Sequence, residues 1–147
     1  MYISLCFCKG FFNELILPGT TRYFLRKDSR LKSRKQIDEL FAKGNSFSNY
    51  PFKVIWLPHN KLAALQAAFS VSSRHFKKAT DRNRIKRLMR ESYRLQKNKL
   101  ETRLAETGKQ LSVFILYVGK EMPAYDLVFE KTGIILKRLD KFVHEAA

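Results

Sequence analysis

The sequence predicts an α+β fold in which helices pack on a small, mostly antiparallel four-stranded sheet. Two observations carry this prediction. The hydrophobic period switches between about 3.6 and two residues along the chain, and the segments follow the order helix, three strands, helix, strand, helix (αβββαβα). The 147 residues, 45% of them hydrophobic, suffice for one domain with one core. We therefore expect a single sandwich domain over residues 22–147.

The first 21 residues differ in composition from the rest, and we expect them to form a poorly ordered N-terminal extension. They are largely apolar, but Lys9 interrupts the run, and neither a basic leading stretch nor a small-residue cleavage site accompanies it. A signal peptide is therefore not expected. An over-called translation start is the alternative, although no methionine lies between Met1 and Met89. No segment reaches the roughly 18 continuous apolar residues of a membrane span.

The first helix is expected over residues 34–43. Ser33 precedes it as a candidate N-cap, and Gly44 follows it as its end. Ile37, Leu40 and Phe41 recur with helical spacing inside it.

Strands are expected at 45–49, 52–57 and 65–71, the last two with clear alternation of apolar and polar residues. Prolines bound the second strand, and the turn after it leads into the third. We expect the third strand to run antiparallel to the second.

The second strand divides its side chains between two faces. Phe52, Val54 and Trp56 share one face, which we assign to the core. Lys53 and Ile55 lie on the opposite face and are candidates to line a groove.

A long basic helix is expected from about Asp81 to Leu104, with Thr80 as its N-cap and Asp81 as its first-turn acid. A helical wheel separates its side chains into two faces. The apolar face comprises Ile85, Leu88, Met89, Ser92 and Leu95, and the cationic face comprises Lys86, Arg87, Arg90, Arg94 and Lys97.

The C-terminal part of the chain predicts one more strand and one more helix. Residues 106–109 end the basic helix, and residues 111–118 are apolar on both faces, which is typical of a central strand. A final helix is expected over 125–143, with Gly133 as a weak point. Its inner side is predicted to comprise Leu127, Ile134, Ile135 and Leu139.

The charge distribution indicates a polyanionic partner. The net charge is +16, and the segment from Arg74 to Arg103 holds 12 cations against 3 acids. A solvated helix face is the ordinary explanation of a charge run, but acids are too few here to pair with the cations. An anionic membrane is the alternative, yet an interfacial helix presents bulky apolar residues opposite its charges. We therefore expect nucleic acid.

Protein-borne catalysis is not expected. The sequence contains no phosphate-binding glycine loop, zinc-protease motif or nucleophile elbow. Asp81 and Glu91 lie nearly three helical turns apart and make no metal site of a nuclease. Cys6 and Cys8, the two cysteines, provide neither a zinc site nor a disulfide framework, so a reducing cytoplasm is the expected location.

The segment Arg82–Glu91, with the sequence RNRIKRLMRE, resembles the signature of the protein subunit of bacterial ribonuclease P. Shorter matches flank it in the same order: RLKS at 30–33, LFAKG at 40–44 and FSVS at 69–72. The resemblance covers about residues 30–143. It implies the αβββαβα order with a left-handed βαβ crossover, a ribosomal protein S5 domain 2-like fold.

The resemblance also implies a division of labour. The RNA subunit, with Mg²⁺ held by RNA and not by a protein site, would cut precursor tRNA, while the protein binds the catalytic RNA and the 5′ leader. The expected RNA-binding residues are Arg74, Lys77, Lys78, Arg82, Asn83, Arg84, Lys86, Arg87 and Arg90, to which the cationic face adds Arg94. The expected leader cleft has Phe41, with Lys53 and Ile55 from the second strand, and Ile55 stands where some relatives carry an aromatic residue.

Three other functions remain open on the sequence: a structural RNA-binding protein, a DNA-binding regulator and a nuclease with its own active site. We expect neither a membrane nor duplex DNA as a partner.

Overall fold

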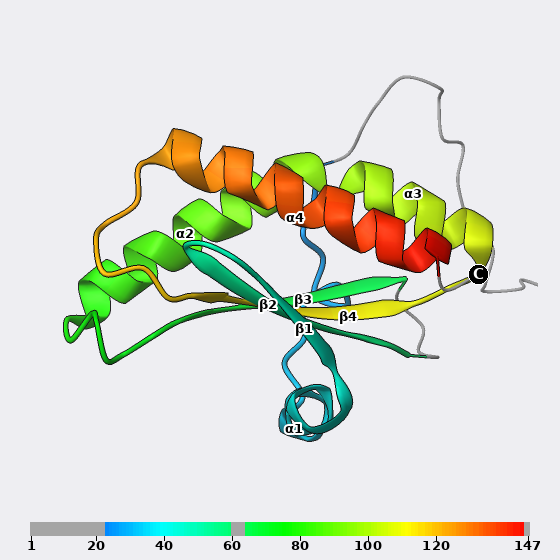
Figure 1. The fold of residues 1–147 in the computed structure, drawn as a ribbon, viewed down its shortest axis with the longest axis horizontal. Coiled ribbons are helices and arrows are strands. Elements are labelled where there is room, and N and C mark those ends of the chain that lie inside the picture. Colours follow the sequence, from blue (N-terminus) through cyan, green and yellow to red (C-terminus); the bar gives the residue numbers. More distant parts are fainter. Residues whose placement is uncertain (1–22, 60–63, 146–147) are drawn as a thin grey trace, which may run out of the picture.

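The computed structural model describes residues 23–59 and 64–145, which form a four-stranded mixed sheet with helices on both faces (Figure 1). In chain order the elements are α1 (Arg34–Lys43), β1 (Asn45–Asn49), β2 (Phe52–Pro58), β3 (Leu65–Val71), α2 (Ala79–Gln96), α3 (Asn98–Thr107), β4 (Leu111–Tyr117) and α4 (Tyr125–Glu145). Helices α2, α3 and α4 cover one face, and α1 covers part of the other. The predicted α+β class and element order are confirmed. The extension expected at residues 1–21 lies outside the described residues.

The sheet has the strand order β1-β2-β4-β3. The pairs β1–β2 and β2–β4 are antiparallel, whereas β3 and β4 are parallel. The central position predicted for the 111–118 strand is confirmed, because β4 pairs on both sides. Strand β3 does run opposite to β2, as expected, but β4 lies between them. Helices α2 and α3 connect β3 to β4, which forms the βαβ crossover.

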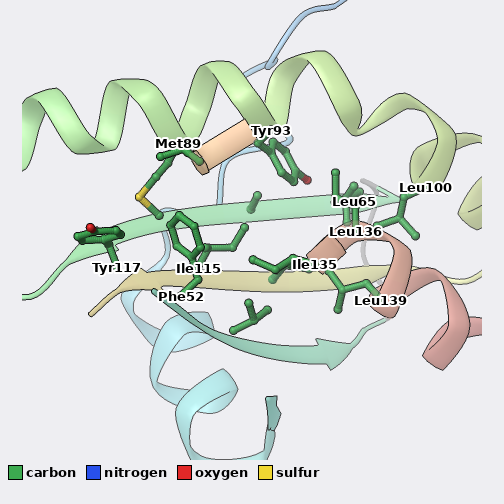
Figure 2. Close-up of a cluster of buried hydrophobic side chains, with 14 of the residues drawn as sticks. Phe52, Leu65, Met89, Tyr93, Leu100, Ile115, Tyr117, Ile135, Leu136 and Leu139 are labelled. Carbon is green, nitrogen blue, oxygen red and sulfur yellow. The ribbon is translucent and has the colours of Figure 1, made fainter. Parts of the chain in front are cut away.

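The main core lies between the sheet and the three helices that cover its first face. Phe52 of β2 and Ile115 of β4 face Met89 and Tyr93 of α2 across this core, and Ile135 of α4 completes it (Figure 2). These side chains are at most 3% exposed. A smaller cluster fills the space under α1 on the second face.

The expected single basic helix is divided in two. Helix α2 ends at Gln96, and Lys97, with φ −63° and ψ −25°, leads directly into α3. Leu100 and Leu104 of α3 are buried in the main core. Helix α2 begins at Ala79, so its N-cap is Lys78. Thr80, the expected N-cap, already lies inside the helix.

The inner side expected for α4 is confirmed at Ile135 and Leu139, which are fully buried, but not at Leu127. Leu127 is 42% exposed, and Val128 is buried in its place. The prediction for Leu127 was wrong. Neighbouring residues of a helix point about 100° apart, so with Val128 directed into the core Leu127 is directed away from it. Gly133 does not interrupt α4; a Cβ there would lie 2.6 Å from the Gln96 side-chain oxygen, so a larger residue would require that side chain to move.

Trp56 packs on the core, as its alternation predicted, and stacks on Phe142 with ring centroids 5.4 Å apart. Because the ring remains partly exposed, we expect Trp56→Ala to lower the free energy of unfolding by about 2 kcal/mol, below the range for fully buried tryptophan. Urea unfolding would measure the change, with Trp56→Phe retaining most of the stability. A loss for Trp56→Ala within 0.5 kcal/mol, the ordinary range of a surface substitution, would contradict this packing role.

Candidate nucleic-acid interface

The outer side of α2 presents a row of cationic side chains to solvent. Arg84, Arg87 and Arg90 are exposed, and Lys86 is partly exposed. The ion pairs found among the described residues involve none of these four. The opposite side of the helix is buried through Ile85, Met89, Ser92 and Tyr93. The predicted separation into an apolar and a cationic face is therefore confirmed for this part of α2.

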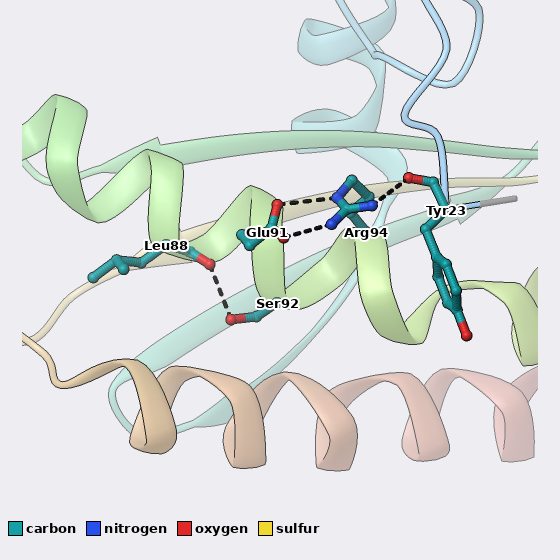
Figure 3. Close-up of polar contacts among 5 residues, drawn as sticks. All are labelled: Tyr23, Leu88, Glu91, Ser92 and Arg94. Atoms are coloured by element: carbon teal, nitrogen blue, oxygen red, sulfur yellow. Dashed lines mark hydrogen bonds and ion pairs between the residues drawn. The ribbon is translucent and has the colours of Figure 1, made fainter.

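Arg94 differs from its neighbours because its guanidinium already has partners within the chain. Nε and Nη2 donate to the Glu91 carboxylate, and Nη1 donates to the backbone carbonyl of Tyr23 at 2.7 Å (Figure 3). The hydrogen bonds from Arg94 hold the pKa of Glu91 below its usual value of 4.5. The expectation that Arg94 contacts RNA stays a prediction, and in this geometry a phosphate would compete with the Glu91 carboxylate for the guanidinium.

Lys97 was expected on the cationic face, and this expectation was wrong. Lys97 is only 4% exposed, and its Nζ pairs with the Glu101 carboxylate one turn later. Lys97 lies four residues after Tyr93 and three before Leu100, which are both buried, so it shares their side of the helix.

Residues 72–78, which connect β3 to α2, form the basic segment. Arg82 joins this basic segment to the start of α2. Its Nη1 donates to the carbonyls of Phe76 at 2.8 Å and Lys77 at 2.6 Å. Phe76 is buried, with its ring 6.0 Å from that of Tyr117, so the segment is anchored on the sheet. A guanidinium carries five N–H donors, and these contacts use Nη1 alone. The residues predicted around Arg82 are exposed, namely Arg74, Lys77, Lys78 and Asn83.

The second face of the sheet carries the residues predicted for a cleft, with one exception. Phe41 of α1 is 52% exposed and packs edge-on against Phe114 with centroids 4.9 Å apart. Lys53 is exposed. Ile55, however, is only 6% exposed and packs beneath α1 with Leu40. The surface role expected for Ile55 was wrong, because α1 covers this position of β2.

Strand pairing aligns further residues with Lys53 across the second face. The register joins Ser48 to Lys53, Lys53 to Leu116 and Leu116 to Ser70. Ser48 is exposed, while Leu116 and Ser70 are partly exposed. These neighbours could not be identified from the sequence, because alternation within a strand does not show that β4 separates β2 from β3.

The cross-strand row and the basic segment meet at one end of the sheet. Strand β3 ends at Val71, and the Ser72 amide donates to the Tyr117 carbonyl at 3.2 Å. Residues 72–78 then run beyond the strand ends before α2 begins (Figure 1). The basic segment therefore joins the end of this row, on the second face, to the start of α2 on the first face.

Among the described residues, no three His, Cys, Asp or Glu side chains gather in a way that could hold a metal ion. None of the helices in residues 23–59 and 64–145 combines the length and hydropathy needed to cross a membrane.

Comparison with known proteins identifies the family. Residues 25–140 match the family model for Ribonuclease P. The chain belongs to the ribonuclease P protein family. The Ribonuclease P protein component of Porphyromonas gingivalis is 34% identical over 106 residues, which cover 71% of this chain and 77% of the relative. The protein component of Chlorobium phaeobacteroides is 31% identical over 136 residues, 84% of this chain and 93% of that relative.

Solved structures agree with this assignment. The ribonuclease P protein of Thermotoga maritima is 28% identical and superposes with a TM-score of 0.58 over 74% of this chain and 96% of its own. That of Staphylococcus aureus shares the fold at 20% identity, with a TM-score of 0.63 over 76% of this chain and 94% of its own. Membership in the ribonuclease P family places the chain in tRNA processing, as the protein component of a ribonucleoprotein endoribonuclease.

Proposed function

We propose that the protein binds the catalytic RNA of ribonuclease P and the 5′ leader of precursor tRNA, and thereby supports endonucleolytic removal of the leader to generate the mature tRNA 5′ end. The observation that carries the proposal is the row of exposed cations on α2, which no carboxylate in the described part of the chain neutralises. Bond cleavage is assigned to the RNA subunit, and the cytoplasm is the proposed location.

The cations of α2 would bind RNA phosphates. Arg84, Arg87 and Arg90 can each donate two parallel hydrogen bonds to a phosphate, which Lys cannot do. Catalytic RNA and precursor tRNA are both polyanions, so a cationic surface between them lowers their repulsion. It also releases counterions from both partners.

The second face of the sheet would hold the leader as a single strand. Phe41 offers an exposed ring for stacking, and Lys53 offers a cation for the backbone. Stacking and phosphate contacts distinguish poorly between bases, which suits a protein that meets many different precursors.

We propose that Mg²⁺ is bound by RNA phosphates. The described residues bring no group of three carboxylate, thiolate or imidazole ligands together. The protein's own contribution is to bind and to orient two RNA molecules.

The test is cleavage of precursor tRNA by the catalytic RNA, with and without the protein, over a range of Mg²⁺ concentrations. We expect the protein to raise the rate most at low Mg²⁺, because added Mg²⁺ also screens the repulsion between the RNAs. No gain in 5′ cleavage would reject the proposal in favour of a structural RNA-binding role. Tighter binding to duplex DNA than to precursor tRNA at equal salt would indicate a DNA-binding protein. Cleavage that persists after removal of all RNA would indicate a protein nuclease.

A further inference from the structure

Tyr50 lies in the turn between β1 and β2 and is the most exposed of the large hydrophobic side chains in the described residues, at 72%. Single exposed aromatic residues are common on protein surfaces and do not by themselves mark a site. The position of Tyr50 relative to the candidate interface is what distinguishes it.

The turn that carries Tyr50 is fixed at the end of the sheet where the two parts of the interface meet. Phe52 pairs with Tyr117, and the Val118 amide donates to the carbonyl of Pro51 at 2.9 Å. Burial, and to a lesser extent the neighbouring Tyr50 hydroxyl and Glu121 carboxylate, raise the pKa of Tyr117. The Tyr117 carbonyl also accepts the hydrogen bond from Ser72, which opens the basic segment. Tyr50 is therefore close to the start of that segment.

Tyr50 also continues the line of the proposed leader cleft. Phe41 rests on Phe114, whose partner in β2 is Ile55. Lys53 lies two residues nearer the start of β2, and Tyr50 lies in the turn that precedes β2. The strand part of this line, from Ile55 back to Phe52, is roughly 10 Å long at about 3.3 Å per residue, and Tyr50 lies beyond it in the turn. An aromatic ring, a cation and a second aromatic ring thus succeed one another toward the basic segment.

The other aromatic side chains of this part of the chain are not available in the same way. Trp56 and Phe47 are partly buried against the main core and pack on Phe142. Their rings belong to the core side of the sheet and not to the second face. Tyr50 can accept a base on its ring without any rearrangement of the core.

We propose that Tyr50 is a stacking platform for one unpaired base of the precursor tRNA leader, at the point where the leader passes from the sheet to the basic segment. This inference rests on the proposed function, since it assumes that the leader follows the second face. It adds a specific contact beyond Phe41 and Lys53. Stacking of this kind tolerates any base, because every base has a π-face.

The experiment uses the reconstituted holoenzyme and precursor tRNAs that carry 2-aminopurine at successive leader positions. We expect one position to show quenched fluorescence on binding, and Tyr50→Leu to abolish that quenching. Tyr50→Leu should also weaken precursor binding roughly fivefold or more, as loss of one stacked base predicts. Tyr50→Phe should retain both properties, and affinity for mature tRNA without a leader should not change.

Phe24→Leu is the matched control, because Phe24 is 69% exposed and belongs to the segment beside Tyr23, whose carbonyl contacts Arg94. It should bind the precursor like the unmodified protein. Precursor affinity and quenching unchanged by Tyr50→Leu would overturn the inference, as would an equal loss of affinity for mature tRNA. If the unmodified holoenzyme does not prefer precursor to mature tRNA, the proposed leader binding itself fails, which is a different result.

Discussion

Replacing Arg87 and Arg90 together with alanine should weaken binding of the protein to ribonuclease P RNA by ten- to a hundredfold at moderate salt. Both side chains are exposed on the side of α2 opposite the core, and no carboxylate among the described residues pairs with them. Each phosphate contact contributes about 0.7–0.9 to the slope of log K against log salt. The slope should therefore fall by about 1.5, as a salt titration of the binding constant would measure.

Two control variants test whether position matters beyond charge. Lys137→Ala/Lys141→Ala removes two exposed cations from α4 and should change the slope much less. Arg94→Ala should also change it little, because the Arg94 guanidinium is already bound to Glu91 and the Tyr23 carbonyl. Equal slopes for the α2 and α4 double variants would mean that RNA senses only the total charge, and the proposed interface on α2 would be wrong.

The elements of the fold could be predicted from the sequence because each is specified locally. The alternation of Phe52, Val54 and Trp56 defines β2, and Gly108 ends α3 in the left-handed conformation, φ 63°, that glycine adopts readily. The order of the strands was not specified in the same way. Alternation identifies a strand and its faces but not its neighbours, so the alignment of Lys53 with Leu116 became visible only in the folded chain.

The candidate site shows the same limit. The exposure of Arg87 and Arg90 follows from the helical period and was predicted, whereas Arg84 was assigned through the resemblance. Ile55 was assigned to a surface because β2 has two faces, but α1 covers the second face at that position. A period describes one element, whereas burial depends on the elements packed against it.

The ion pairs of Arg94 and Lys97 have a local cause. Their partners, Glu91 and Glu101, lie three and four residues away, spacings at which helical side chains meet. The sequence therefore contained the signal for both pairs. The burial of Lys97 was not predicted, and it follows from that of Tyr93 and Leu100, which lie on its side of the helix.

Glu101→Ala should lower the free energy of unfolding by about 2–3 kcal/mol. The substitution removes the acidic partner of Lys97, whose side chain is only 5% exposed, and leaves an ammonium group with little access to water. Breaking a fully buried pair costs about 3–5 kcal/mol. The Glu101 side chain is 37% exposed, so solvent already screens the pair in part and the expected loss is smaller. Urea unfolding at neutral pH would measure it.

Lys97→Met should change stability by less than about 1 kcal/mol, because it keeps most of the buried side-chain volume and removes the charge that needs a partner. The partly exposed Glu101 can then be solvated. The double variant Lys97→Met/Glu101→Ala should resemble Lys97→Met, so the double-mutant cycle should give a coupling energy of about 2 kcal/mol. If Lys97→Met is as destabilising as Glu101→Ala, the pair stabilises the junction of α2 and α3 as a unit. The cost would then not arise from an unpaired buried charge.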